Sequence, residues 1–170
     1  HVGATPIFSD VLIDTMNLDV SQLEEKITDK TKAIIPIHFA GRPCDMDSIL
    51  DLAKKYKLFV VEDAAHAIES KYKNKKIGII GDLTSFSFYS TKNVTTIEGG
   101  MVTTNNDEWA EIIKMYALHG LNKDAWKRYS DEGFKHYETL FPGYKYNMTD
   151  VQSSLGIHQL SRVEENLIIR

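Results

Sequence analysis

Two apolar runs separated by a helical pattern constrain the fold of this chain more than any other feature. Residues 31–38 (TKAIIPIH) and 58–63 (LFVVED) have the composition of buried strands. Between them, apolar residues recur at helical spacing over 46–56, after a capping aspartate at Asp45 or Asp47. Strand, helix and strand joined by short loops are typical of a parallel sheet. We therefore predict an α/β fold with a mostly parallel sheet sandwiched by helices.

Further elements are expected on both sides of this unit. The patterns predict a short strand over residues 5–11, a helix over 21–27 capped by Asp19, a hairpin over 72–77 with Asn74 in the left-handed turn position, strands over 85–88 and 101–104, and helices that begin after Asn105 or Asn106 and after Thr149. Residues 121–147 are polar, aromatic and aperiodic, and so long a loop is usually functional.

Composition narrows the class of protein. The chain has 170 residues, 42% hydrophobic and 26% charged, which fits one domain with a sizeable core. A net charge of -4 gives no basic footprint for nucleic acid, and no apolar run is long enough to span a membrane. A single cysteine, Cys44, cannot form an internal disulfide. We expect no nucleic-acid or membrane partner and a reducing, cytoplasmic compartment.

The carboxyl ends of parallel strands are where such sheets bind ligands. That rule indicates His38, Asp63 and the loop after Phe88, which carries Lys92. Each residue also has an ordinary interpretation: Lys92 as a solvated loop lysine and Asp63 as a helix cap. In the same way, His66 could be a half-buried histidine and Ser87 a strand hydroxyl bonded to backbone. The motifs GxGxxG, P-loop, HExxH and GxSxG are absent from the sequence.

Several segments in one order carry a resemblance. They are VEDAAHA at 61–67, Gly81-Asp82, FSFYSTKN at 86–93, Glu98-Gly99-Gly100, His119-Gly120 and PGYKYNMTDVQ at 142–152, preceded by GATPIFSD at 3–10 and KAIIPIH at 32–38. This pattern resembles the sugar aminotransferases of the DegT/DnrJ/EryC1/StrS family across almost the whole chain. The resemblance implies a pyridoxal 5'-phosphate (PLP) enzyme of fold type I, with the large domain of the aspartate aminotransferase-like transferases.

The resemblance implies a role for each site residue. Asp63 matches the carboxylate that keeps the PLP pyridine nitrogen protonated, and His66 the flat side chain over the ring. Lys92 matches the Schiff-base lysine, which would also move the proton during transamination. The hydroxyl matching Ser87 binds the PLP phosphate. Asn147 matches a residue that reaches the phosphate from a neighbouring subunit, which implies a homodimer, although Asn147 also reads as a turn residue before a helix.

The sequence departs from the family pattern in three places away from these residues. Ile97 stands where many members have Gly, Asn74 replaces a common turn Gly, and Ala117 stands near a frequent Arg. The family's N-terminal phosphate loop and C-terminal small domain have no counterpart in residues 1–170. We therefore expect a partial PLP-binding large domain cut from a longer protein, which alone binds PLP weakly or not at all. A processed or tagged complete domain is the alternative.

The resemblance implies transfer of an amino group, from glutamate as donor, to a nucleotide-linked keto sugar in polysaccharide biosynthesis. Two alternatives stay open. A PLP-dependent nucleotide-sugar dehydratase is disfavoured by Lys92, because those relatives have His in its place. A non-catalytic regulatory or interaction protein with the same fold is disfavoured by intact Asp63, Ser87 and Lys92. Trp126, Lys127, Arg128 and Tyr129 could hold a diphosphate and a base, or form a solvated rim.

Overall fold

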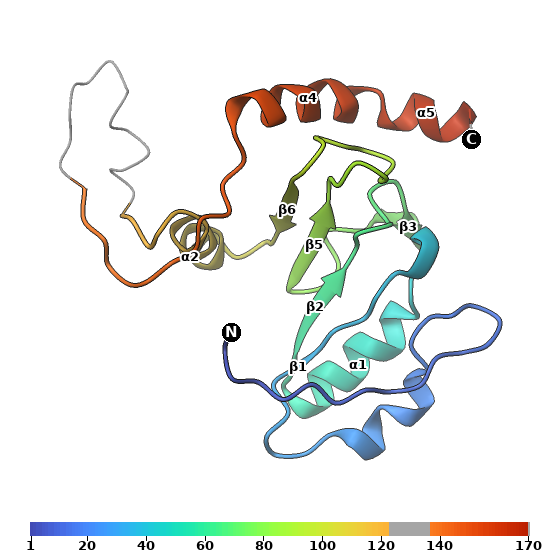
Figure 1. Ribbon diagram of the computed structural model, residues 1–170. Coiled ribbons are helices and arrows are strands. Elements are labelled where there is room, and N and C mark those ends of the chain that lie inside the picture. Colours follow the sequence, from blue (N-terminus) through green and yellow to red (C-terminus); the bar gives the residue numbers. More distant parts are fainter. Residues whose placement is uncertain (123–136, 170) are drawn as a thin grey trace. The chain divides into compact units, whose positions relative to one another are not determined.

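The computed structural model describes residues 1–122 and 137–169 (Figure 1). The chain divides into two compact units. The first comprises residues 1–105 together with 151–170, and the second comprises residues 106–150. The first unit holds the main sheet and most of the predicted site, so it is described first.

A four-stranded sheet forms the centre of the first unit. Its strands are β1 (Ala33–Ile34), β2 (Phe59–Asp63), β5 (Leu83–Ser87) and β6 (Gly100–Thr103), in the spatial order β1-β2-β5-β6. Strands β1, β2 and β5 pair in parallel, and β6 runs antiparallel to β5. The predicted α/β fold with a mostly parallel sheet is therefore confirmed.

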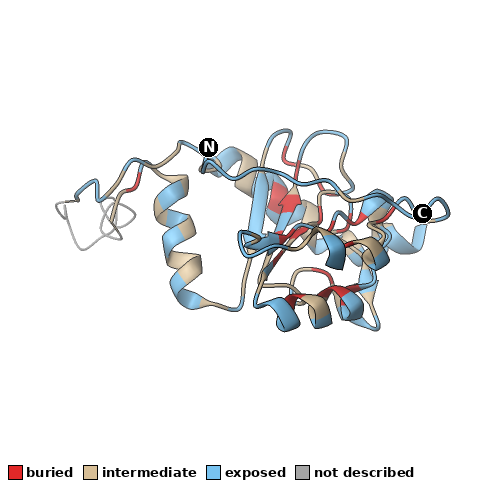
Figure 2. Cartoon of the chain, turned by 90° about the horizontal axis from the view of Figure 1, so that it is seen from below, coloured by how far each residue is buried: buried red, intermediate tan, exposed pale blue. Residues whose placement is uncertain are grey.

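Helix α1 (Met46–Tyr56) covers one face of this sheet (Figure 1). Asp45 caps it, accepting from the Ser48 N–H at 3.5 Å, which decides between the two predicted caps. Its buried residues Met46, Ile49 and Ala53 join the core formed with β1 and β2 (Figure 2). Full burial of a side chain as large as Met or Ile contributes about 1.5–3 kcal/mol to the free energy of folding. The face of α1 that carries Met46 and Ile49 therefore anchors the fold.

The opposite face of the sheet is exposed in the described residues. Burial alternates along 33–38 and along β2, with Ile34, Val60 and Glu62 buried and their neighbours not. Ile35, Ile37 and Phe59 are 62%, 53% and 51% exposed. The apolar runs had predicted strands covered on both faces. The alternation arises because successive side chains of a strand point to opposite sides, and α1 covers one of them.

Two predictions for the first residues are corrected by the structure. The strand expected over residues 5–11 does not form, and Val11 makes an isolated bridge to Leu18. No neighbouring strand lies within reach to pair with it in the described residues, and Ile7 and Phe8 are largely exposed. The helix expected over 21–27 is two short 3₁₀ helices, η1 (Val20–Gln22) and η2 (Glu24–Lys26), although Asp19 caps as predicted.

The predicted hairpin and the strands after it form, whereas the last helix, expected as one, is divided at Arg162 into two. The hairpin is β3 (Lys71–Tyr72) and β4 (Lys75–Lys76), with Lys73 and Asn74 at positive φ. A 3₁₀ turn, η3 (Phe39–Gly41), follows the extended segment 33–38. Helices α4 (Asp150–Ser161) and α5 (Val163–Ile169) form the end of the chain.

The second unit is built on α2 (Asp107–Ala117), which Asn106 caps through the Trp109 N–H at 3.1 Å. Bridges from Leu118 to Lys145 and from Leu121 to Thr139 close the segment that follows. Within the parts of the chain that the structure describes, no helix combines the length and apolar character needed to cross a membrane.

Candidate active site

Two adjoining hollows lie at the carboxyl ends of β2 and β5. One, of about 280 Å³, is lined by Asp63 and Ser87 among others, and the second, of about 290 Å³, by His66, Ser87 and Lys92. Both share Ala65 and Ser87. Small-molecule sites have volumes of roughly 300–1,000 Å³, so the joined hollows reach that range. The fold thus brings together four of the five predicted site residues, from segments up to thirty residues apart.

Asp63 is the last residue of β2, and both of its backbone groups bond to the neighbouring segment 36–38. Its N–H donates to the Pro36 carbonyl at 2.9 Å, and its carbonyl accepts from the His38 N–H at 3.0 Å. The carboxylate Oδ1 accepts from the Ala65 N–H at 3.0 Å, which is a local turn bond, because no helix follows directly among the described residues for Asp63 to cap. A carboxylate has about four acceptor positions, so this turn bond is compatible with a ligand in the hollow.

Ser87 ends the neighbouring strand, β5. Its Oγ accepts from the Tyr89 N–H at 3.3 Å and lines both hollows. Because β2 and β5 are parallel and register Asp63 against Ser85, Ser87 lies two residues further toward the same edge. A carboxylate and a hydroxyl are therefore presented on one open side of the sheet, as the resemblance implied.

Lys92 lies on a loop that is anchored at several points. Its N–H donates to the Tyr89 carbonyl at 3.0 Å, and the next side chain, Asn93, donates to Glu69 at 2.9 Å. Further along, Val94 and Thr96 are 1% and 0% exposed. The lysine itself is half-buried. These anchors fix the backbone of the loop that carries Lys92, and the role of its amine stays a prediction.

The loop after Lys92 reaches a residue with unusual backbone. Ile97 has φ of 72°, in the left-handed region that β-branched residues rarely adopt. This is the position where family members often have Gly, so the noted departure falls where the backbone conformation suits glycine. Beside it, the Glu98 carbonyl accepts from Thr96 Oγ1 and from Gln152 Nε2 of α4, both at 2.9 Å. These contacts hold the strained turn in place.

His66 follows Asp63 by three residues and lines the second hollow. Its ring meets that of Phe39 edge to face, with centroids 6.4 Å apart. Asn147 belongs to the second unit, where its Oδ1 contacts Lys145 Nζ and its Nδ2 donates to the Met148 carbonyl at 3.4 Å. Its contact with a neighbouring subunit stays a prediction. Trp126, Lys127, Arg128 and Tyr129 lie outside the described residues.

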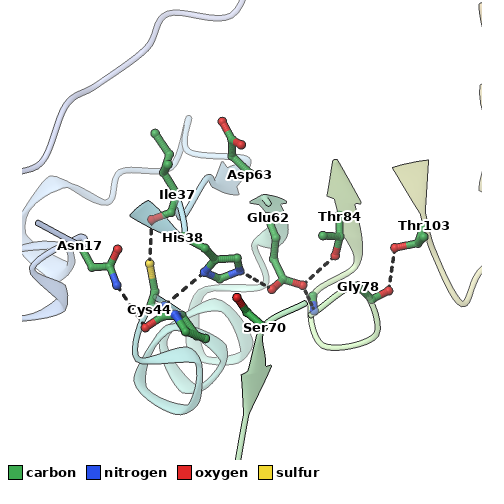
Figure 3. Close-up of polar contacts among 12 residues, drawn as sticks. Asn17, Ile37, His38, Cys44, Glu62, Asp63, Ser70, Gly78, Thr84 and Thr103 are labelled. Carbon is green, nitrogen blue, oxygen red and sulfur yellow. Dashed lines mark hydrogen bonds and ion pairs between the residues drawn. The ribbon is translucent and has the colours of Figure 1, made fainter. Parts of the chain in front are cut away.

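His38 is not in the hollow, although the strand-end rule had indicated it. Its side chain is 1% exposed and its Nε2 lies 2.8 Å from Glu62 Oε2 (Figure 3). The sequence interpretation had no role for Glu62 beyond ending a strand with Asp63. The alternation of β2 could have found it, since Glu62 shares its face with the buried Val60.

Burial raises the pKa of the nearby Cys44 thiol to about 11, so Cys44 is not a thiolate nucleophile.

One protein family matches this chain over its whole length. The family model of the DegT/DnrJ/EryC1/StrS aminotransferase family matches residues 1–170. The chain belongs to this family. The predicted resemblance is therefore confirmed, and the fold found here is the one that its members share.

Three curated relatives are similar over nearly the whole chain. An uncharacterized protein of Methanocaldococcus jannaschii is 60% identical over 96% of this chain and 42% of its own length. The spore coat polysaccharide biosynthesis protein SpsC of Bacillus subtilis is 53% identical over 97% of this chain and 42% of its own. GDP-perosamine synthase of Caulobacter vibrioides is 45% identical over 100% of this chain and 43% of its own. The chain thus spans less than half of these family members.

Solved structures in the family agree with the fold. Helicobacter pylori PseC, an aminotransferase involved in the biosynthesis of pseudoaminic acid, matches with a TM-score of 0.87 and 34% identity, over 96% of this chain and 42% of PseC. The PLP-form of Streptococcus pneumoniae Spr1654, which is named as a sugar aminotransferase, matches with a TM-score of 0.86 and 38% identity, over 97% of this chain and 45% of Spr1654. GDP-4-keto-6-deoxymannose-3-dehydratase (ColD) matches with a TM-score of 0.80 and 27% identity, over 92% and 42%.

The residues of the hollows fit a cofactor such as PLP. That molecule needs an acceptor for a protonated ring nitrogen, a donor for phosphate and an amine for its aldehyde. A carboxylate, a hydroxyl and an amine of these kinds are present in Asp63, Ser87 and Lys92, which line the two adjoining hollows.

Proposed function

We propose that this chain is part of the PLP-binding large domain of an enzyme that transfers an amino group from glutamate to a nucleotide-linked keto sugar. The observation that carries the proposal is the gathering of Asp63, His66, Ser87 and Lys92 around two connected hollows at one edge of the sheet. The name of GDP-perosamine synthase supports a nucleotide-sugar substrate, the description of PseC supports an aminotransferase reaction, and the name of SpsC supports polysaccharide biosynthesis.

Asp63 and Ser87 would hold the cofactor in opposite ways. The Asp63 carboxylate would accept from the protonated pyridine nitrogen, and the fixed end of β2 makes that charge rigid. Ser87 would donate to the phosphate from the neighbouring strand. His66 would pack flat against the ring from the turn that follows Asp63. When bound, PLP supplies an electron sink that stabilises negative charge at a substrate carbon.

Lys92 would serve as the amine that holds the cofactor and later moves a proton. A lysine amine acts in both ways when it is neutral and within reach of the reacting carbons. The anchored loop keeps this side chain at the rim of the second hollow. In the balanced reaction, glutamate loses its amino group to become 2-oxoglutarate. The keto carbon of the sugar gains that amino group in place of oxygen.

We further propose that the working protein is a homodimer in a cytoplasmic compartment. The resemblance implies that Asn147 reaches the phosphate of the neighbouring subunit, so each site would need two chains. The protonated, buried Cys44 is compatible with a reducing compartment. The 170 residues alone would bind PLP weakly, because the relatives are more than twice as long and part of the phosphate contacts is expected outside this region.

A nucleotide-sugar dehydratase is the second candidate, because ColD is among the structural matches. Lys92 argues against it, since the dehydratases that resemble this family have His at that position. The two reactions leave different products. A dehydratase would remove a hydroxyl from the sugar and release ammonia, whereas the proposed enzyme leaves nitrogen on the sugar carbon.

The test uses the product of the complete native gene. With PLP, ¹⁵N-labelled glutamate and a panel of nucleotide-linked keto sugars, we expect 2-oxoglutarate and a sugar that carries ¹⁵N in equal amounts. A deoxygenated sugar without ¹⁵N would instead identify the dehydratase. A protein that binds PLP but changes neither substrate would support the non-catalytic alternative. Lys92→Ala is the matched control, in which no ¹⁵N should reach the sugar.

A further inference from the structure

We propose that the buried pair His38 and Glu62 positions Asp63 in the site, an inference that rests on the proposed function. Glu62 and Asp63 are consecutive residues of β2, so their side chains leave opposite faces of the sheet. Figure 3 shows the Asp63 carboxylate directed away from the network that holds Glu62. The side chains of His38 and Glu62 are both 0% exposed, so neither side chain is open to a ligand, although Glu62 is among the residues along the first hollow.

The hydrogen bonds of His38 fix its tautomer. The Cys44 N–H donates to His38 Nδ1 at 3.2 Å, so this nitrogen is an acceptor and carries no proton. The remaining ring nitrogen, Nε2, then carries the proton and donates to Glu62 Oε2 at 2.8 Å. The pair is therefore a neutral imidazole and a carboxylate with one defined geometry. A ring rotated by 180° would lose both bonds.

Glu62 collects donors from three other segments. Its Oε2 accepts from His38, and its Oε1 accepts from the Gly81 N–H at 2.7 Å and from Thr84 Oγ1 at 2.8 Å. Burial alone raises the pKa of this carboxyl, but these hydrogen bonds outweigh it and hold the pKa below its usual value. A Cβ at Gly81 would lie 2.9 Å from Glu62 Oε1 and 3.0 Å from the Val60 carbonyl, so this close approach requires glycine.

This network ties together the segments that also carry the backbone bonds of Asp63. His38 continues the segment whose Pro36 carbonyl and His38 N–H bond the peptide groups of Asp63. Thr84 belongs to β5, whose Ser85 carbonyl accepts from the Ala64 N–H at 2.8 Å. The segments on both sides of β2 are thus joined to it twice, once by backbone hydrogen bonds in the plane of the sheet and once through the Glu62 side chain on the buried face.

Stability alone does not account for such a pair. A buried carboxylate loses its hydration, and apolar residues of similar volume often serve a core equally well. What a fully satisfied polar network adds is a single geometry, because any displacement leaves a donor or acceptor unpaired. That property suits a strand end whose carboxylate must meet a ring nitrogen at hydrogen-bonding distance, where errors of about 1 Å reduce rates strongly.

The test first measures whether a change at His38 loosens the backbone at Asp63 more than it loosens helix α1. It then measures PLP binding. His38→Leu removes the donor to Glu62 and puts an apolar side chain in the place of the ring, whereas His38→Gln provides an N–H donor again. Hydrogen exchange of the full chain, followed by NMR, should show the Asp63 and Ala64 amides exchanging at least about tenfold faster in His38→Leu, relative to the Ala53 amide of α1. His38→Gln should return that ratio to within about threefold of the parent value.

Thr103→Val is the matched control, because it removes a hydrogen bond from the same sheet, Thr103 Oγ1 to the Gly78 carbonyl at 2.7 Å, that involves neither His38 nor Glu62. It should leave the ratio unchanged. In the complete gene product, the dissociation constant for PLP should rise about tenfold in His38→Leu, which corresponds to about 1.4 kcal/mol of binding free energy. It should return to the parent value in His38→Gln.

Equal acceleration at Asp63, Ala64 and Ala53 in His38→Leu would overturn the positioning role. An unchanged PLP dissociation constant despite faster exchange at Asp63 would overturn it as well. A parent gene product that binds no PLP would overturn the proposed function itself, and this failure is seen in the parent protein before any variant is compared.

Discussion

Glu62 and Asp63 are adjacent carboxylates on one strand, yet they have opposite surroundings. Glu62 accepts three hydrogen bonds in the core, from His38, Gly81 and Thr84. Asp63 lines a hollow and, within the described residues, its carboxylate accepts one, from the Ala65 N–H. The difference comes from strand geometry, which sends one side chain toward α1 and the next toward the open face.

The comparison teaches that a reactive carboxylate can be held by a structural one. In this proposal, backbone hydrogen bonds place Asp63. Those hydrogen bonds depend on neighbouring segments that the Glu62 side chain joins on the buried face of the sheet. The buried face supplies order, and the open face supplies the chemistry. Each of the following experiments separates these two roles.

The largest effect is expected from removing the buried carboxylate. Glu62→Leu leaves the donors of His38, Gly81 and Thr84 unsatisfied, so the free energy of unfolding should fall by about 3–5 kcal/mol. Asp63→Ala loses one turn bond at a half-buried position and should cost about 1 kcal/mol. Urea unfolding followed by circular dichroism measures both. Equal losses in the two variants would remove the distinction between the faces.

Asp63→Asn should affect binding rather than folding. Replacing the charged acceptor of the ring nitrogen should weaken PLP binding about 100-fold, or about 2.7 kcal/mol, in the complete gene product. The free energy of unfolding of the apoprotein should change by less than about 0.5 kcal/mol, because asparagine can keep the bond from the Ala65 N–H. Spectroscopic titration with PLP gives the affinity. Unimpaired binding would exclude Asp63 as the partner of the ring.

Acid should weaken the buried face specifically. The pKa of Glu62 is lowered in the folded chain from its usual value of 4.5, so the unfolded state binds the proton more readily. The stability that Glu62 contributes is complete above pH 4.5 and is lost as the pH falls through the lowered folded pKa. Urea unfolding between pH 6 and pH 3 should show a shallower acid loss in Glu62→Leu than in the parent.

The smallest effect concerns strain on the site side. Ile97 has φ of 72° with 63% of its side chain exposed, so Ile97→Gly should raise the free energy of unfolding by about 0.5–1 kcal/mol. Lys57 ends α1 at φ of 54° and is the matched position on the structural side. Lys57→Gly should gain less, because an unbranched side chain tolerates this conformation better. Thermal unfolding compares the two, and a loss of stability in Ile97→Gly would contradict the strain.

Much of the first unit could be predicted because its signals are local. The spacing of Met46, Ile49 and Ala53 indicates a helix, Asp45 its cap, and the flanking apolar runs the strands of a parallel sheet. The strand expected over residues 5–11 failed for the opposite reason. A strand depends on a partner, and the composition of a segment does not say whether one is present.

The site needed information of another kind. The strand-end rule indicated Asp63 and the loop that carries Lys92, but the role of each residue, and the choice of Ser87, came from the resemblance to a family pattern. The division of labour between Glu62 and Asp63 was missed, since the sequence shows two carboxylates at a strand end and does not say which face α1 covers. His38 was assigned to the ligand edge because the strand-end rule gives the edge but not the direction of the side chain.

The central claim is that Lys92 is the amine at which this site holds PLP. The most direct measurement treats the PLP-loaded product of the complete gene with borohydride, digests it and locates the pyridoxyl group by mass spectrometry. We predict one modified residue, Lys92, at close to one group per chain, with modification abolished in Lys92→Ala. Modification of other lysines in place of Lys92, or none in a protein that binds PLP, would contradict the account.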